Sequence, residues 1–323
     1  MNPKEILEKV NEAISRMAYP TQPEGLYEPI KYVLSLGGKR IRPVFMLLAY
    51  RLYKENIDYI MTAAIGLEMY HNFTLLHDDL MDKADIRRGK PTVHKKWDAN
   101  TAILSGDSMM MMAAKMIHSV DSPNNWEATD LFCKTALEIG EGQQYDMNFE
   151  QRDDVLLDEY MEMIRLKTSV LLACAFKMGA IYGGANEKDS DLLYRFGEKI
   201  GLAFQLQDDY LDVYGNPLTF GKRIGGDILC NKKTFLLINA LNLADAETKN
   251  RLESLLCATE IHPEEKIKAV TDIYNQLEIG ALCRQKEASL FEEARQLLSE
   301  VSVCPEKRDE LWQFVENLRN RNV

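Results

Sequence analysis

Three aspartates, Asp78, Asp79 and Asp82, end a largely apolar stretch that begins near Gly66. At about 100° per residue, a helix places Asp78 and Asp82 on one face with Asp79 on its flank. Carboxylates grouped in this way repel one another unless a cation lies between them. A solvated helix end is the alternative, but the helix dipole disfavours acidic residues at a C-terminus. The cluster therefore predicts a site for a hard divalent ion, and Mg²⁺ fits carboxylates that are completed by phosphate oxygens.

A second acidic cluster with the same spacing, Asp208, Asp209 and Asp212, follows another apolar stretch much later in the chain. Gln205 shares their helical face, because residues three, four and seven positions apart lie on one side of a helix. A polar stripe of this kind either faces solvent or lines a cavity, and the apolar residues around it favour the cavity. One such motif is a weak signal. Two of them indicate that both clusters face one cavity and bind divalent ions and a phosphate ligand together.

Basic residues are concentrated in loops beside glycines and beside the aspartates. Most surface cations only interact with water, but adjacent arginines next to three aspartates can bind phosphate oxygens bidentately. Glycines let the backbone approach an anion, although no Walker-type pattern is present. The loops contain Lys39, Arg40 and Arg42; Arg87 and Arg88; and Lys222, Arg223, Lys232 and Lys233.

Two polar residues within apolar stretches each have two interpretations. Lys167, followed by Thr168, lies in the middle of an apolar run, so its ammonium group either reaches the surface or faces an anion inside the protein. His71 lies seven residues before Asp78 and shares its helical face. A lone histidine is more often a packed core residue than a ligand, and the sequence alone does not make it a general base.

Composition excludes several classes of function. The formal net charge of −11 argues against a nucleic-acid-binding surface. No run of about 18 apolar residues is present, so no transmembrane segment is expected, and the amino terminus reads as an amphipathic helix and not as a secretory signal. The six cysteines are scattered without a Cys-x-x-Cys pair, which favours reduced cysteines in a cytoplasmic protein over a zinc site or disulfides.

Helical periodicity runs through nearly the whole chain, and alternating strand patterns are absent. Helices are expected at about residues 101–119, 126–149, 154–182 and 188–214, with turn-rich loops at 83–92 and 215–233. No linker divides the chain. The sequence therefore predicts an all-α protein in which residues 1–323 form a single domain.

The motifs occur in an order that resembles the trans-isoprenyl diphosphate synthases, the family of farnesyl and geranylgeranyl diphosphate synthases. The resemblance runs from about residue 24 to residue 240. It rests on the segments 37–43, 76–82, 87–92, Gly106-Asp107, Gly142-Gln143, Lys167-Thr168, 204–212 and 225–234.

This resemblance implies a large, mostly antiparallel helical bundle of the isoprenoid synthase type around a deep central cavity, usually a homodimer with three Mg²⁺ ions per active site. The small-molecule substrates would be isopentenyl diphosphate and an allylic diphosphate, joined head-to-tail by ionisation, condensation and elimination of a proton. The metal ligands would be Asp78, Asp79, Asp82, Asp208, Asp209 and Asp212. The catalytic residues Lys167, Thr168, Gln205, Lys222 and Lys232 would grip the allylic diphosphate together with Arg87, and isopentenyl diphosphate would be bound by Lys39, Arg42, His71 and Arg88.

Members of this family set product length with residues just before the first aspartate, here Tyr70, Phe73 and Thr74. The aromatic Phe73 argues against very long products, and the small Thr74 leaves room. Only two residues separate Asp79 from Asp82, as in archaeal-type synthases. The pattern favours a C20 product, with C15 close behind. A terpene cyclase is an alternative, although it needs no second diphosphate site. A non-catalytic regulatory subunit is another, although such subunits tend to lose an acidic cluster.

Overall fold

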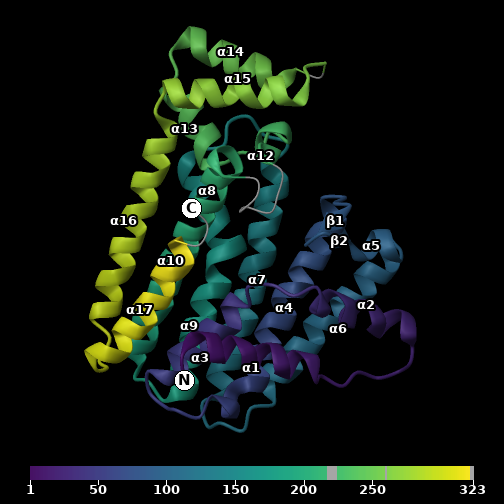
Figure 1. Cartoon of the computed structure of the whole chain (residues 1–323), viewed down its shortest axis with the longest axis vertical. Coiled ribbons are helices and arrows are strands. Elements are labelled where there is room, and N and C mark those ends of the chain that lie inside the picture. The colour runs from purple at the N-terminus through teal and green to yellow at the C-terminus, as the bar shows by residue number, and fades with distance from the viewer. Residues whose placement is uncertain (217–223, 259, 321–323) are drawn as a thin grey trace. The chain divides into compact units, whose positions relative to one another are not determined.

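The computed structural model describes residues 1–216, 224–258 and 260–320, and their secondary structure is almost entirely helical (Figure 1). The chain divides into two compact units. The first unit contains Met1–Lys134, Cys174–Leu193 and Ser302–Lys307, and the second contains Thr135–Ala173, Tyr194–Val301 and Arg308–Val323. Four of the five boundaries fall inside helices, and the fifth, between residues 301 and 302, falls between two helices. The four helices are α7 (Asn125–Phe149), α9 (Val170–Gly183), α10 (Glu187–Tyr214) and α17 (Pro305–Asn320).

The first unit begins with three helices and continues through the long helix that ends in the first acidic cluster. Its elements are α1 (Pro3–Ser15), α2 (Glu24–Ser35), α3 (Ile41–Arg51), the 3₁₀-helix η1 (Ile57–Ile60), α4 (Met61–Met81), β1 (Ile86–Arg87), β2 (Lys90–Pro91), α5 (Val93–Lys96) and α6 (Ala99–His118). The two short strands pair antiparallel, with Ile86 opposite Pro91 and Arg87 opposite Lys90.

Local sequence determines where α1 begins. Asn2 accepts a hydrogen bond from the Glu5 backbone N–H (3.0 Å), and the Glu5 carboxylate accepts one from the Asn2 backbone N–H (2.8 Å). This reciprocal capping box satisfies two donors that a helix start leaves unpaired. Pro3 occupies the first turn, where its missing N–H removes no hydrogen bond.

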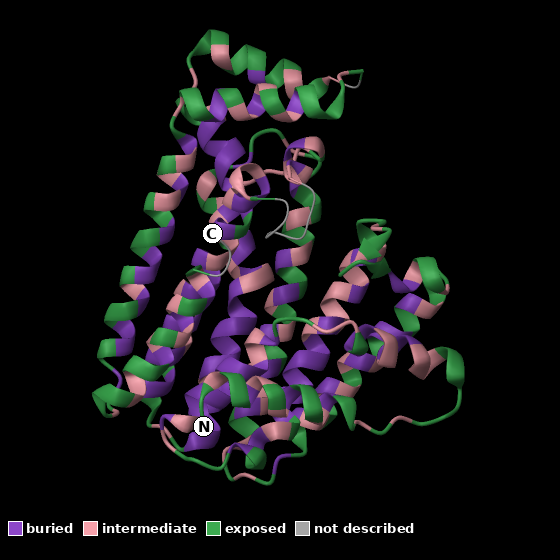
Figure 2. Ribbon diagram, viewed as in Figure 1, coloured by how far each residue is buried: buried purple, intermediate pink, exposed green. Residues whose placement is uncertain are grey.

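The core of the first unit is built on α3 and α4. Residues 43–50 of α3 and residues 63–70 of α4 are all buried (Figure 2). Gly66 lets α4 pack closely on α6, because a Cβ atom there would lie 3.0 Å from the Ala113 carbonyl oxygen. Since the middle of α4 is fixed by this packing, its last turn is presented from a rigid support.

The second unit contains the second acidic cluster on α10. Its other elements are α8 (Leu157–Ile164), the π-helix η2 (Arg165–Ser169), α12 (Gly226–Leu229), α13 (Phe235–Leu243), α14 (Ala246–Cys257), α15 (Pro263–Gln276) and α16 (Ile279–Ser299). Helices α14 and α15 pack together as a helical pair, shown in green in Figure 1.

The all-α prediction is confirmed, with three local differences within the described residues. The loop predicted at 83–92 contains the short β1–β2 hairpin, and the loop predicted at 215–233 contains the short helix α12. The helix predicted at 154–182 is divided by the π-turn of η2. No helix of the described residues is both long and apolar enough to cross a bilayer. That residues 1–323 form one domain remains a prediction.

Candidate functional site

The first acidic cluster, Asp78, Asp79 and Asp82, lies at the C-terminal end of α4. Asp79 is buried, and Arg87 Nε donates to both of its carboxylate oxygens at 2.8 Å. Burial raises the pKa of Asp79 to about 6. The Arg87 guanidinium opposes this rise, and the neighbouring Asp78 and Asp82 add to it. Asp78 is half-buried and Asp82 is exposed. Asp79 is therefore held by the protein, and the other two carboxylates are more accessible.

Three of the four residues predicted to bind isopentenyl diphosphate are brought together in the first unit. Arg42 Nη1 donates to His71 Nε2 at 3.2 Å, and Arg88 donates to the Gly37 carbonyl. Burial, followed by the charges of Arg42 and Arg88, lowers the pKa of His71 well below its usual value. His71 is therefore neutral near pH 7 and accepts at Nε2. Lys39, the fourth residue, is exposed in the same loop as Gly37.

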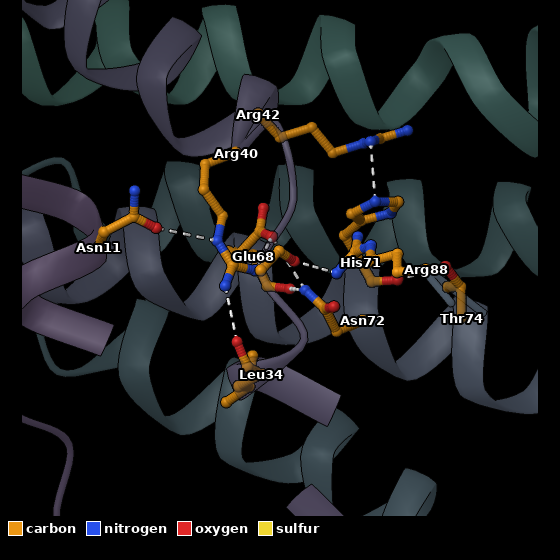
Figure 3. A network of polar contacts seen from close by, with 10 residues as sticks. Asn11, Leu34, Arg40, Arg42, Glu68, His71, Asn72, Thr74 and Arg88 are labelled. Atoms are coloured by element: carbon orange, nitrogen blue, oxygen red, sulfur yellow. Dashed lines mark hydrogen bonds and ion pairs between the residues drawn. The ribbon is translucent and has the colours of Figure 1, made fainter. Parts of the chain in front are cut away.

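A buried network that the sequence analysis missed lies beside this set (Figure 3). Arg40 Nη1 donates to Glu68 Oε1 at 2.7 Å, Nη2 donates to the Leu34 carbonyl at 2.6 Å, and Nε donates to Asn11 Oδ1 at 3.3 Å. Asn72 Nδ2 also donates to Glu68 Oε1, at 2.9 Å. The Arg40 side chain is therefore buried and hydrogen-bonded within the protein, whereas Lys39 is exposed and Arg42 is half-buried. The sequence did offer one sign of this network, because Glu68 is the single acidic residue in the apolar part of α4.

In the second acidic cluster, Asp208, Asp209 and Asp212, the middle aspartate is again held by protein donors. Tyr160 Oη donates to Asp209 Oδ2, the Phe235 backbone N–H donates to the same oxygen at 3.3 Å, and Gln205 Nε2 donates to Oδ1 at 3.1 Å. Burial raises the pKa of Asp209 to about 7, although the hydrogen bond from Tyr160 opposes this rise. Both oxygens of Asp209 are thus engaged.

The outer two aspartates of this cluster differ in environment. Asp208 is exposed. Asp212 is buried, and its Oδ2 accepts a hydrogen bond from the Asp227 backbone N–H at 3.0 Å. The Asp212 carbonyl accepts a bond of 2.6 Å from Gly225 N–H, which fastens the start of α12 to α10.

Lys167 and Thr168, predicted to grip the allylic diphosphate, project from the π-turn of η2. Lys167 Nζ lies 2.6 Å from Asp146 Oδ2 on α7, and both side chains are about one quarter exposed, at 23% and 24%. Thr168 Oγ1 donates to Gln205 Oε1 at 3.2 Å. Since Gln205 also donates to Asp209, a continuous hydrogen-bonded path connects Thr168 with the second acidic cluster.

The other cations predicted to bind the allylic diphosphate lie in different places. Arg87 is in the first unit, on Asp79. Lys232 is half-buried in the second unit and lines a small cavity together with Asp209 and Tyr274. Lys222 and the neighbouring Arg223 lie outside the described residues.

The residues predicted to set product length form part of an aromatic series in the first unit. The ring centroids of Phe73 and Tyr70 are 5.3 Å apart, and those of Tyr70 and Phe132 are 5.1 Å apart. Phe73 also meets the His77 ring edge-on at 4.8 Å. Thr74 Oγ1 donates to the His71 carbonyl at 2.8 Å, so its hydroxyl group is satisfied by its own helix. Phe132, on α7, is a member that the sequence analysis missed.

The acidic clusters fit Mg²⁺ by ligand type. Within the described residues, no three His, Cys, Asp or Glu side chains converge closely enough to hold an ion by themselves. Mg²⁺ does not require such a cage, because it is usually held by one or two carboxylates and completed by water and phosphate oxygens. Asp78, Asp82 and Asp208 are the carboxylates best placed to serve in this way, since Asp79 and Asp209 already accept bonds on both oxygens.

Comparison with known proteins agrees with these features. The family model described as polyprenyl synthetase matches residues 23–276. The geranylgeranyl diphosphate synthase of Methanosarcina mazei is 38% identical over 302 residues, which cover 92% of this chain and 90% of that protein. The geranylfarnesyl diphosphate synthase of Natronomonas pharaonis is 39% identical over 252 residues, covering 72% and 74%. A crystal structure of a geranylgeranyl pyrophosphate synthase superposes with a TM-score of 0.95 at 42% identity, covering 100% of both chains.

The helical architecture and the two acidic clusters define a protein of the all-α isoprenoid synthase fold. The chain belongs to the polyprenyl synthetase family.

Proposed function

We propose that this prenyltransferase is a Mg²⁺-dependent short-chain synthase that condenses isopentenyl diphosphate with allylic diphosphates and that its main product is C20 geranylgeranyl diphosphate. The observation that carries the proposal is that each acidic cluster ends or nearly ends a long helix with one aspartate locked by protein donors and another aspartate exposed. Such a pair of clusters suits a diphosphate held through metal ions. C15 farnesyl diphosphate is the nearest alternative product.

In this proposal the allylic diphosphate is bound by Arg87, Lys167 and Lys232, and Thr168 is oriented by Gln205. Bound Mg²⁺, expected as three ions on the two acidic clusters, would neutralise charge on the diphosphate and make it a better leaving group. The cations of this chain stabilise the negative charge that develops on the diphosphate as the bond to the allylic carbon breaks.

The second substrate is placed by the other basic set. Arg42, Arg88 and Lys39 bind the diphosphate of isopentenyl diphosphate, and neutral His71 orients Arg42 through their 3.2 Å hydrogen bond. The isopentenyl double bond attacks the allylic carbon, and a proton is then lost to the departing diphosphate. Because His71 is surrounded by arginines and its pKa is lowered, it is a poor general base for this step.

The aromatic series supports a product of limited length. Phe73 lies five residues before Asp78, which is about one and a half helical turns. Tyr70 lies three residues further from the first acidic cluster, and Phe132 packs against it. Three rings in succession would close a tail pocket that extends away from the diphosphate. We therefore expect growth to stop at C20 and not to continue to long polyprenyl chains.

We also propose that the protein is a homodimer in a reducing compartment such as the cytoplasm. Leu104 and Met111 lie seven residues apart on α6 and are 60% and 64% exposed, so one face of this helix presents large apolar side chains. A second copy of the chain would cover this face.

The state of the cysteines fits the proposed reducing compartment. All six cysteines are in described residues, and none forms a disulfide.

The proposal is tested by incubating the purified protein with Mg²⁺, labelled isopentenyl diphosphate and a C5, C10 or C15 allylic diphosphate, followed by analysis of product length. We expect C20 product from each primer and none in EDTA. No labelled prenyl product from any primer would favour a non-catalytic subunit, and a hydrocarbon formed from the allylic diphosphate alone would identify a cyclase.

A further inference from the structure

The π-turn of η2 is a local departure from regular helix at the two residues that the proposed function assigns to the allylic diphosphate. Arg165–Ser169 adds one residue to a turn between α8 and α9, and the Val170 N–H donates to the Arg165 carbonyl five residues earlier. Such insertions persist only where the surrounding structure supports them. The neighbours of η2 therefore determine how Lys167 and Thr168 project.

Two glycines from two different helices contact the backbone of this turn. Gly142 on α7 is buried against it, and a Cβ atom there would lie 2.8 Å from Lys167 Cα and still closer to the Lys167 backbone nitrogen. Gly201 on α10 is also buried, and a Cβ atom there would lie 2.6 Å from Ser169 Cα. Real Cβ atoms do not approach backbone this closely, so no residue larger than glycine fits either position without moving the turn.

Each glycine is followed, four residues later on the same helix, by the polar residue that holds a side chain of the turn. On α7, Gly142 precedes Asp146, which pairs with Lys167 at 2.6 Å. On α10, Gly201 precedes Gln205, which accepts from Thr168 at 3.2 Å. Residues four apart lie one above the other on a helix face. The close packing of Gly142 and Gly201 on η2 therefore sets how near Asp146 and Gln205 come to the side chains of the π-turn.

We propose that Gly142 and Gly201 are positioning residues that bring Asp146 and Gln205 onto Lys167 and Thr168 and so set these two side chains for the allylic diphosphate. This inference rests on the proposed function. It assigns no contact with substrate to the glycines. A methyl group at either position would force the π-turn to shift, and a misplacement of about 1 Å can cost about 100-fold.

The test compares Gly142→Ala and Gly201→Ala with Gly140→Ala. Gly140 is on α7, two residues from Gly142, and a Cβ atom there would meet nothing within 4 Å. We expect the first two variants to raise the KM for the allylic diphosphate about 10- to 100-fold and to leave the KM for isopentenyl diphosphate within about twofold. Gly140→Ala should match the wild type in both. Folded Gly142→Ala and Gly201→Ala with unchanged KM values, or with both KM values raised equally, would overturn the inference.

A second variant covers the case in which alanine prevents folding. Asp146→Ala removes the partner of Lys167 without disturbing the backbone contact, and Asp146→Asn keeps an oxygen that accepts from Lys167. We expect a roughly 10-fold rise in the allylic KM for Asp146→Ala, partial rescue in Asp146→Asn, and no change in Glu141→Ala, which removes an exposed carboxylate from the same helix. Equal KM values for all three would contradict the inference.

The same variants separate this inference from the proposed function. If the wild type turns over no primer, the proposed function fails, and the inference is then judged by calorimetric titration of the same variants with inorganic pyrophosphate and Mg²⁺. Weaker pyrophosphate binding in Gly142→Ala and Asp146→Ala than in Gly140→Ala would support it, and equal binding would reject it.

Discussion

Arg40 and Glu68 form an ion pair in which Arg40 Nη1 lies 2.7 Å from Glu68 Oε1 and the two side chains are only 3% and 2% exposed (Figure 3). Arg40 lies between Lys39 and Arg42 in the chain, and Glu68 lies one turn before His71 on α4. The pair therefore fastens the basic loop to the helix that carries its histidine. Arg40 has φ +48°, a left-handed conformation that turns its side chain out of line with its neighbours.

We expect removal of one partner of this pair to be far more harmful than removal of both. Arg40→Met leaves Glu68 charged and buried and should lower the free energy of unfolding by about 3–5 kcal/mol. The double variant Arg40→Met with Glu68→Leu should recover most of this loss, because apolar side chains of similar volume can replace a buried pair. Urea unfolding measures both values. Lys39→Met, an exposed neighbour, is the control and should change stability little.

Failure of the double variant to recover stability would show that the hydrogen bonds of Arg40 to Leu34 and Asn11 matter more than its charge. If Arg40→Met were as stable as the wild type, the burial of the Arg40–Glu68 ion pair would be contradicted.

The environment of Asp209 predicts a pH dependence of stability in the metal-free protein. Its pKa is raised by burial from 3.8 to about 7 in the folded protein. The folded state therefore retains a proton that the unfolded state releases, so the stability from this group is complete below about pH 4 and is lost as the pH rises through about 7. Asp209→Asn cannot titrate. In EDTA, the Tm of the wild type should fall relative to that of Asp209→Asn between pH 5 and pH 8, and a constant difference would contradict the assignment.

The aromatic series predicts how product length can be changed. Phe73→Ala removes the ring nearest the first acidic cluster and should lengthen the product, while Tyr70 and Phe132 remain to limit growth. Chain-length analysis of the labelled products measures the shift. Tyr59→Ala, which removes an exposed aromatic side chain, should leave the product unchanged. An unchanged spectrum for Phe73→Ala would remove its role.

The sequence was sufficient for the elements that follow from periodicity and local spacing. The helices at 101–119, 126–149 and 188–214 were predicted within two residues of α6, α7 and α10. The resemblance assigned Arg42, His71 and Arg88 to isopentenyl diphosphate, and the structure places these side chains near one another. Their role in binding that substrate stays a prediction.

The features that were missed depend on contacts between distant residues or on backbone detail. The extra residue of η2 leaves the apolar pattern of 154–182 intact, so periodicity predicts an unbroken helix there. Nothing in the chain around Arg40 indicates that its partner is 28 residues away. The two interpretations of Lys167 were both incomplete, since it is partly exposed and paired with Asp146.

In the proposed function, both acidic clusters hold one diphosphate through Mg²⁺. Calorimetric titration with inorganic pyrophosphate, in Mg²⁺ and in EDTA, tests it on the wild type, Asp82→Ala, Asp208→Ala and the double variant. If the clusters share the ligand, pyrophosphate should bind the wild type only with Mg²⁺, each single variant should weaken it at least 10-fold, and the double variant should lose little more than a single one. Binding that persists in EDTA, or two single losses that simply add, would contradict the account.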